Sequence, residues 1–143
     1  MLRESKLVKA IENYFLRNYD VSRMTMAEAT DLRFKRPDLL FIQARRDCLH
    51  VIEVESTISR AFSDHHGFKQ LSKYKGNYKW LALPYDEYLK APERVDRECN
   101  RRGIGLILVS GIKHLRVWEE IQPTYRRGDF LRYYPEAEQE WYE

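Results

Sequence analysis

The chain has 143 residues, a length that favours one domain over two. Hydrophobic residues make up 43% and charged residues 33%, and six Gly and five Pro are too few for a low-complexity chain. No apolar run approaches the roughly 18 residues of a membrane span, and charges interrupt the N-terminal apolar residues, unlike a secretory signal. We therefore expect a soluble, cytoplasmic domain with reduced cysteines and no membrane partner.

The formal net charge is +3, from 25 Lys and Arg against 22 Asp and Glu. This balance is compatible with nucleic-acid binding but does not require it. The basic residues cluster along the chain at Arg33, Lys35 and Arg36, at Arg45 and Arg46, at Lys69, Lys73, Lys75 and Lys79, and at Arg101 and Arg102. Each cluster taken alone is equally compatible with solvated surface charge.

The first half of the chain predicts a helix followed by a β-hairpin. Apolar residues at helical spacing predict a helix over residues 4–18, whereas residues 20–30 are ambiguous between strand and helix. Two apolar, branched segments, residues 38–43 and 49–55, are separated by a polar stretch, as in a hairpin.

The second half alternates helices and strands. Its predicted elements are a helix over residues 64–75 capped by Gly76, a strand over 78–83, a helix over 92–102 followed by Gly103, and strands over 104–109 and 114–119. Strands joined through helices imply parallel pairs with right-handed crossovers. The order predicts an α/β fold in which a mixed central β-sheet is flanked by helices on both faces.

Acidic residues stand out in the predicted hairpin. Because side chains alternate along a strand, Glu53 and Glu55 share one face of a segment that otherwise has the composition of a buried strand. Two carboxylates on a buried face repel each other and lose hydration unless something compensates. A divalent cation such as Mg²⁺ would compensate, and Asp38 starts the partner strand. Alternatively, the two glutamates lie on a solvated face or pair with Arg and Lys.

These residues carry a resemblance to a known superfamily. Arg36-Pro37-Asp38, followed after fourteen residues by Glu53-Val54-Glu55, resembles the signature of the PD-(D/E)XK nucleases. The segment Gln70-Leu71-Ser72-Lys73-Tyr74 is similar to the QxxxY motif of the RecB-like branch. The order of elements from residue 4 to about 110 also resembles the restriction-endonuclease-like core. We expect that fold over residues 1–121, and the aromatic and charged tail over residues 122–143 lies outside the resemblance.

The resemblance also implies roles for individual residues. Asp38 and Glu53 would be metal ligands, and the main-chain carbonyl of Val54 a third. Gln70 and Tyr74 would line the site and help to hold the substrate strand or the helix that carries them.

The chain departs from the family motif at Glu55, where the usual residue is Lys. Glu55 would accept a proton or hold a second metal, or a lysine would arrive from the following helix, where Lys73 and Lys69 flank Gln70. A third interpretation is a degenerate site that does not cut. The superfamily often takes a further acid from its first helix, for which Glu12 is the candidate.

The resemblance implies metal-dependent hydrolysis of DNA phosphodiester bonds, with Mg²⁺ as cofactor and Mn²⁺ able to replace it. The alternative is a catalytically inactive module of the same fold that binds nucleic acid or a protein partner. A homodimer would let two sites face two strands of DNA. The tail would pack on the core or on a dimer partner, or its aromatic residues would stack on bases.

Overall fold

The structure, a computed structural model, describes residues 3–26, 37–43, 48–134 and 137–139, of which 25, 26 and 137–139 are described by their backbone alone. The basic clusters predicted at residues 33–36 and 45–46 lie outside these ranges. The described strands are β1 (Val21–Met26), β2 (Leu39–Gln43), β3 (Leu49–Val54), β4 (Tyr78–Pro84), β5 (Gly105–Ser110), β6 (Arg116–Ile121) and β7 (Ala137–Gln139). The helices are α1 (Glu4–Asn18), α2 (Ile58–Ala61), α3 (Gly67–Lys73), α4 (Tyr85–Tyr88), α5 (Pro92–Arg102) and a 3₁₀ turn over Leu131–Tyr133.

The strands form a seven-stranded mixed sheet in the order β6-β5-β4-β3-β2-β1-β7. β3, β4 and β5 run parallel to one another, and the chain crosses between them through α2 and α3 and then through α4 and α5. The remaining neighbours are antiparallel, including the β2–β3 hairpin. The predicted α/β class with a mixed sheet is confirmed.

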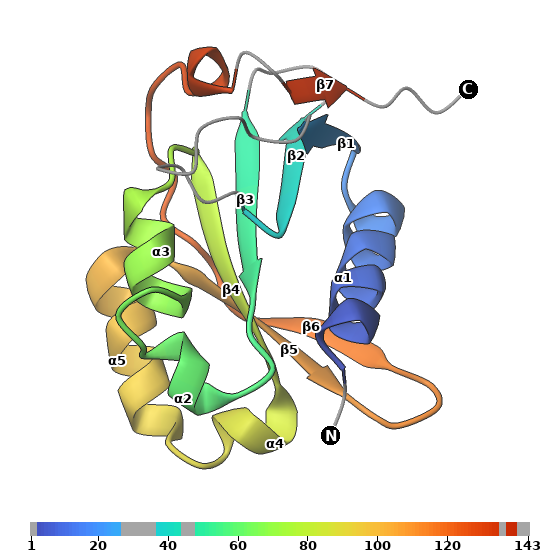
Figure 1. The fold of residues 1–143 in the computed structure, drawn as a ribbon, viewed down its shortest axis with the longest axis vertical. Helices are drawn as coiled ribbons and strands as arrows, with labels where there is room; N and C mark the ends of the chain where they lie inside the picture. Colours follow the sequence, from blue (N-terminus) through green and yellow to red (C-terminus); the bar gives the residue numbers. More distant parts are fainter. Residues whose placement is uncertain (1–2, 27–36, 44–47, 135–136, 140–143) are drawn as a thin grey trace.

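Helices cover both faces of the sheet, as predicted (Figure 1). α1 buries Leu7, Ile11 and Phe15 completely, at a spacing of four residues, in a core cluster with one face of the sheet. α3 and α5 contribute Leu71 and Val95, among others, to the core cluster on the opposite face. The alternating side chains of β2 and β3 contribute to both clusters, which explains why both strands are rich in apolar residues.

The predicted helix over residues 64–75 is wrong in its bounds. α3 begins only at Gly67 and ends at Lys73, and Tyr74 is already extended, with φ −72° and ψ 151°. Gly76 is not the helix cap. A Cβ at Gly76 would lie 2.5 Å from Cγ2 of Val51, so glycine is required there because the chain passes against β3.

The other predicted helices and strands are present in the structure, with small differences in their bounds. α1 and α5 have the predicted bounds, and Gly103 ends α5 in the left-handed conformation with φ +67°. The ambiguous segment forms β1 in its described part, and the last predicted strand lies two residues later, as β6. The short helices α2 and α4 were not predicted, because four residues are too few for a periodic pattern.

The segment after β6 packs over one end of the sheet. The Asn77 side chain donates hydrogen bonds to the carbonyls of Arg126 and Gly128, and the Tyr134 hydroxyl donates to the carbonyl of Lys75. Phe130 and other apolar residues of this segment pack against the core cluster beneath α3. β7 then pairs with β1, so the chain is tied to two separate parts of the fold. Within the described residues, no helix is both long and apolar enough to cross a membrane.

Candidate functional site

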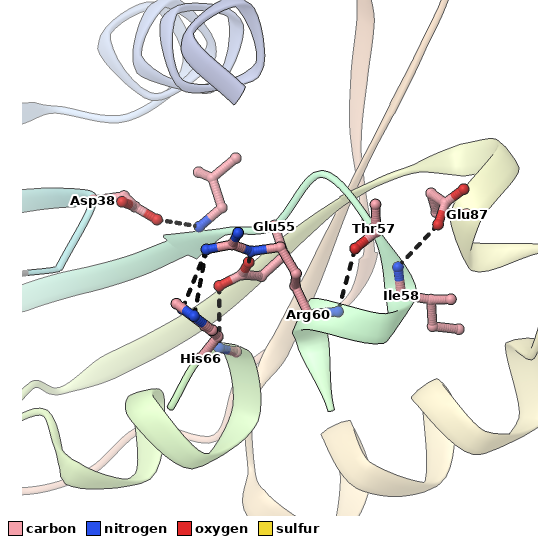
Figure 2. A network of polar contacts seen from close by, with 9 residues as sticks. Asp38, Glu55, Thr57, Ile58, Arg60, His66 and Glu87 are labelled. Atoms are coloured by element: carbon pink, nitrogen blue, oxygen red, sulfur yellow. Dashed lines mark hydrogen bonds and ion pairs between the residues drawn. The ribbon is translucent and has the colours of Figure 1, made fainter. Parts of the chain in front are cut away.

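Asp38 and Glu53 meet where β2 begins beside β3. The register pairs Leu39 with Ile52, which places Asp38 opposite Glu53. Oδ2 of Asp38 accepts a hydrogen bond from the main-chain N–H of Val54 at 2.7 Å (Figure 2). The main-chain N–H of Asp38 in turn donates to Oε1 of Glu53 at 3.3 Å. The two acidic residues, which fourteen residues separate in the sequence, are therefore neighbours in the fold.

The proline before Asp38 explains why Val54 is available to this site. The N–H of Gln43 donates to the carbonyl of Cys48 at 2.9 Å, which marks these residues as a hydrogen-bonded pair of the antiparallel ladder. Hydrogen-bonded pairs recur every second residue, so the same register brings Pro37 opposite Val54. Proline has no N–H, and it cannot donate to the Val54 carbonyl. The Pro37-Asp38 sequence thus removes the ladder donor and supplies a carboxylate at the same point.

The carboxyl group of Glu53 is electrostatically strained in the absence of a cation. Its side chain is 5% exposed, and burial is the main cause that raises its pKa to about 9. The neighbouring charges of Asp38 and Glu55 raise the pKa further, whereas hydrogen bonds from Asp38 and Tyr74 act in the opposite direction. A positive ion at this position would reverse the balance and favour the ionised carboxylate.

Gln70 and Tyr74 reach the site from the inner face of α3 and from the residue directly after it. Both are buried, and the Tyr74 hydroxyl donates to Oε1 of Glu53 at 3.3 Å. Burial, followed by the charge of Glu53, raises the pKa of Tyr74, so its hydroxyl stays protonated and acts as a donor. Tyr74 therefore contacts the predicted ligand on β3, and the side chain of Gln70 forms a hydrogen bond with Tyr74.

Glu55, the residue that departs from the family motif, is held by Arg60 and by the main-chain N–H of Gly67. Its carboxylate is 2% exposed and accepts hydrogen bonds from the N–H of Gly67 at 3.1 Å and from Nε of Arg60 at 3.4 Å (Figure 2). Nη2 of Arg60 also contacts the ring of His66. Gly67 has φ +53°, and a Cβ there would lie 2.1 Å from the carbonyl oxygen of Ala61. Glu55 therefore fixes the first residue of α3 at a position that requires glycine.

A second carboxylate braces the same connection between β3 and α3. The N–H of Ile58, the first residue of α2, donates to Glu87 on α4 at 3.0 Å. Thr57 caps α2 by accepting the N–H of Arg60 at 3.2 Å. These contacts and those of Glu55 hold α2 and the start of α3 in place. The position of α3, and with it the contact between Tyr74 and Glu53, therefore depends on this network.

For two predicted site residues, Glu12 and Lys73, the described contacts are not with Asp38 or Glu53. Glu12 is buried on α1 and forms ion pairs with Arg23 on β1 and with Lys9. Lys73 is an exposed residue at the end of α3. Within the residues that the structure describes, no group of three or more His, Cys, Asp and Glu side chains could hold a metal ion. The site is therefore a pair of carboxylates with a main-chain carbonyl beside it.

Lys79 is a buried cation on the same face of the sheet. It lies opposite Val51 in the β3–β4 register and is 4% exposed. Burial, and then the charges of Arg126 and Lys75, lower its pKa to about 8. Its Nζ donates to the carbonyl of Ser72 at 3.5 Å, near the end of α3, where a positive charge is favoured by the helix dipole. The sequence showed Lys79 only as one member of a basic cluster, without a sign that it is buried.

Comparisons with the profiles of known protein families, with curated proteins and with solved structures find no match for this chain.

Proposed function

We propose that this chain is a metal-dependent endonuclease that hydrolyses DNA phosphodiester bonds, with a fold of the restriction-endonuclease-like type. The observation that carries the proposal is the meeting of Asp38 and Glu53 beside the Val54 carbonyl. Three features of the sequence that resemble the PD-(D/E)XK motif, namely the proline, the aspartate and the first glutamate, each have a distinct place in that geometry.

The residues fit a magnesium ion by their chemistry. Mg²⁺ is bound in proteins by one or two carboxylates, and water molecules and substrate phosphate oxygens complete its coordination. Asp38 and Glu53 supply the two carboxylates, and a bound cation would offset the burial and the neighbouring charges of Asp38 and Glu55 that raise the pKa of Glu53. When bound, the ion would neutralise charge on the phosphodiester and make a water molecule a better nucleophile.

The contacts of the site hold its two carboxylates and α3 in position. Tyr74 donates to Oε1 of Glu53 and so restricts the direction of that carboxylate. Asp38 is held through the N–H of Val54, which fixes its carboxylate at the start of β2. Glu55 acts through Gly67 and Arg60 by positioning α3, and we therefore assign to it a positioning role in place of proton transfer.

A second candidate function is a nuclease-like module that binds nucleic acid or a protein without cutting. Two observations favour it: Glu55 replaces the motif lysine, and its carboxylate is engaged with Gly67 and Arg60. Lys73, which would take the place of the motif lysine, is exposed at the end of α3 and is not buried beside Glu53. Metal binding without cleavage would support this second candidate.

Substitution of Asp38 tests the proposal. We expect the wild-type protein with Mg²⁺ or Mn²⁺ to cut DNA and Asp38→Asn to lose at least about a hundredfold in rate, because the variant lacks the charge that holds the ion. The measurement is the conversion of supercoiled plasmid, and of linear duplex and single-stranded DNA, over time. Asp129→Asn, on the exposed segment after β6, is the matched control and keeps the wild-type rate. Failure of the wild-type protein to cut any of these forms would contradict the proposal.

A further inference from the structure

A basic groove lies between α1 and the turn that joins β5 to β6. Its volume is about 660 Å³. The cations that line it are Lys6, Lys9 and Arg17 on one wall and Lys113 and Arg116 on the other. No acidic residue belongs to the lining that the structure describes. Figure 1 shows the β5–β6 turn beside the N-terminal part of α1. The groove is a region of concentrated positive charge formed by two distant parts of the chain.

The helix wall of the groove follows from the periodicity of α1. Lys6, Lys9, Asn13 and Arg17 stand at spacings of three and four residues, so they form one stripe along the helix. The stripe is opposite the buried stripe that begins at Leu7. Because the opposite face of α1 packs in the core, the three cations of the helix lie on its outer face and line the groove.

The second wall is the β5–β6 turn. Gly111 has φ +111°, and a Cβ there would lie 2.3 Å from the carbonyl oxygen of His114, so the tight turn requires glycine. The turn presents the exposed side chain of Lys113, and Arg116 follows at the start of β6. Across the groove, Lys6 and Arg17 are also exposed. Within the described residues, ion pairs to carboxylates are found for Lys9 alone of the five lining cations.

The dimensions and charge of the groove favour an extended polyanion over a single small anion. From Lys6 to Arg17 the helix rises about 16 Å, at 1.5 Å for each residue. Along that length one strand of a DNA duplex carries about five phosphates, at 3.4 Å for each. Ile112 at the turn is 87% exposed, but it is a single apolar side chain and does not make the broad apolar face that inserts into a lipid surface.

We propose that this groove binds the phosphate backbone of duplex DNA. The site is separate from the Asp38–Glu53 pair, because α1 covers the face of the sheet opposite to the one that α3 covers. The inference goes beyond the proposed cleavage and does not depend on it, since the groove would hold DNA in a protein that does not cut. Contacts of this kind position a duplex and carry no sequence information.

The test is the affinity for a labelled duplex of about 20 base pairs, measured by fluorescence anisotropy in EDTA so that no cleavage occurs. We expect the double variant Lys6→Glu/Lys113→Glu to lose at least about tenfold in affinity at about 0.1 M salt, and the slope of log K against log salt to fall by about 2 in magnitude. Arg97→Glu/Arg127→Glu makes the same change in net charge at exposed residues outside the groove. It should lose clearly less affinity.

Two outcomes would overturn the inference. One is equal weakening by both double variants, which would show a general effect of net charge. The other is binding of the wild-type protein to anionic lipid vesicles but not to DNA. Circular dichroism verifies that both double variants are folded. Binding by the groove variant is measured in EDTA, whereas cleavage by Asp38→Asn is measured with Mg²⁺. Failure of the groove inference and failure of the proposed cleavage are therefore separate results.

Discussion

The variant Glu53→Gln is expected to be more stable than the wild-type protein at pH 8 in EDTA, and to lose metal-dependent cleavage. The reason is the buried carboxyl group, whose pKa is raised from 4.5 to about 9 in the folded protein. Between these two values the folded state holds a proton that the unfolded state releases. The free energy of unfolding that Glu53 contributes is therefore fully present below pH 4.5 and is lost as the pH rises through 9.

The size of the effect follows from the shift. The difference between 9 and 4.5 is 4.5 pKa units, which sets an upper bound of about 6 kcal/mol on the loss across this pH range. Glutamine has the same shape without the titrating proton, so the stability of Glu53→Gln should depend less on pH in this window. Urea unfolding from pH 4 to pH 9 measures the difference. Glu93→Gln, at an exposed position on α5, is the control and should follow the wild-type profile.

Mg²⁺ should act on the two proteins differently. It should stabilise the wild-type protein at pH 8, because it favours the ionised form of Glu53 and binds only the folded state. It should leave Glu53→Gln nearly unchanged. Parallel pH profiles for Glu53→Gln and the wild-type protein in EDTA would contradict the account of this carboxyl group.

The second large effect is expected for Glu55→Lys, the substitution that restores the family motif. The change removes the acceptor of the Gly67 N–H and places a buried ammonium beside the Arg60 guanidinium. An uncompensated charge at a position that is 2% exposed should lower the free energy of unfolding by at least about 3 kcal/mol. We expect cleavage to fall with it, because α3 then loses the contact that sets the position of Tyr74.

Two further variants separate charge from geometry at this position. Glu55→Gln keeps an oxygen for the Gly67 N–H and should cost only about 1–2 kcal/mol. Glu55→Lys/Arg60→Glu restores opposite charges and should recover part of the loss. The measurements are urea unfolding and plasmid cleavage for all three variants. A Glu55→Lys protein of wild-type stability that cuts faster would show that the new side chain reaches the Asp38–Glu53 pair, against the positioning role.

Much of the fold could be predicted because its elements have strong local signals. The apolar stripe of α1 and the apolar residues of β2, β3 and β5 follow directly from burial on one or both faces. The helix over 64–75 was predicted too long because two tertiary contacts outweigh local pattern there. Glu55 sets the start of α3 at Gly67, and the packing of Gly76 against Val51 draws the chain away from the helix.

The candidate site was predictable in part for the same reason. Strand alternation and register bring Asp38 and Glu53 together, and both follow from the hairpin pattern. The partners of Glu55 did not follow, since the contact to Gly67 depends on how the chain turns between β3 and α3. The basic groove was missed because its cations lie on α1 and on the β5–β6 turn, about a hundred residues apart. Clusters counted along the sequence do not detect such an arrangement.

Calorimetric titration with Mn²⁺ tests the proposed metal site most directly. The titration compares the wild-type protein with Asp38→Ala and with Glu53→Ala, each first checked for folding by circular dichroism. The proposed site predicts saturable binding of Mn²⁺ to the wild-type protein and loss of that binding in both variants. Absence of binding to the wild-type protein, or equal binding to all three, would contradict the assignment of Asp38 and Glu53 as metal ligands.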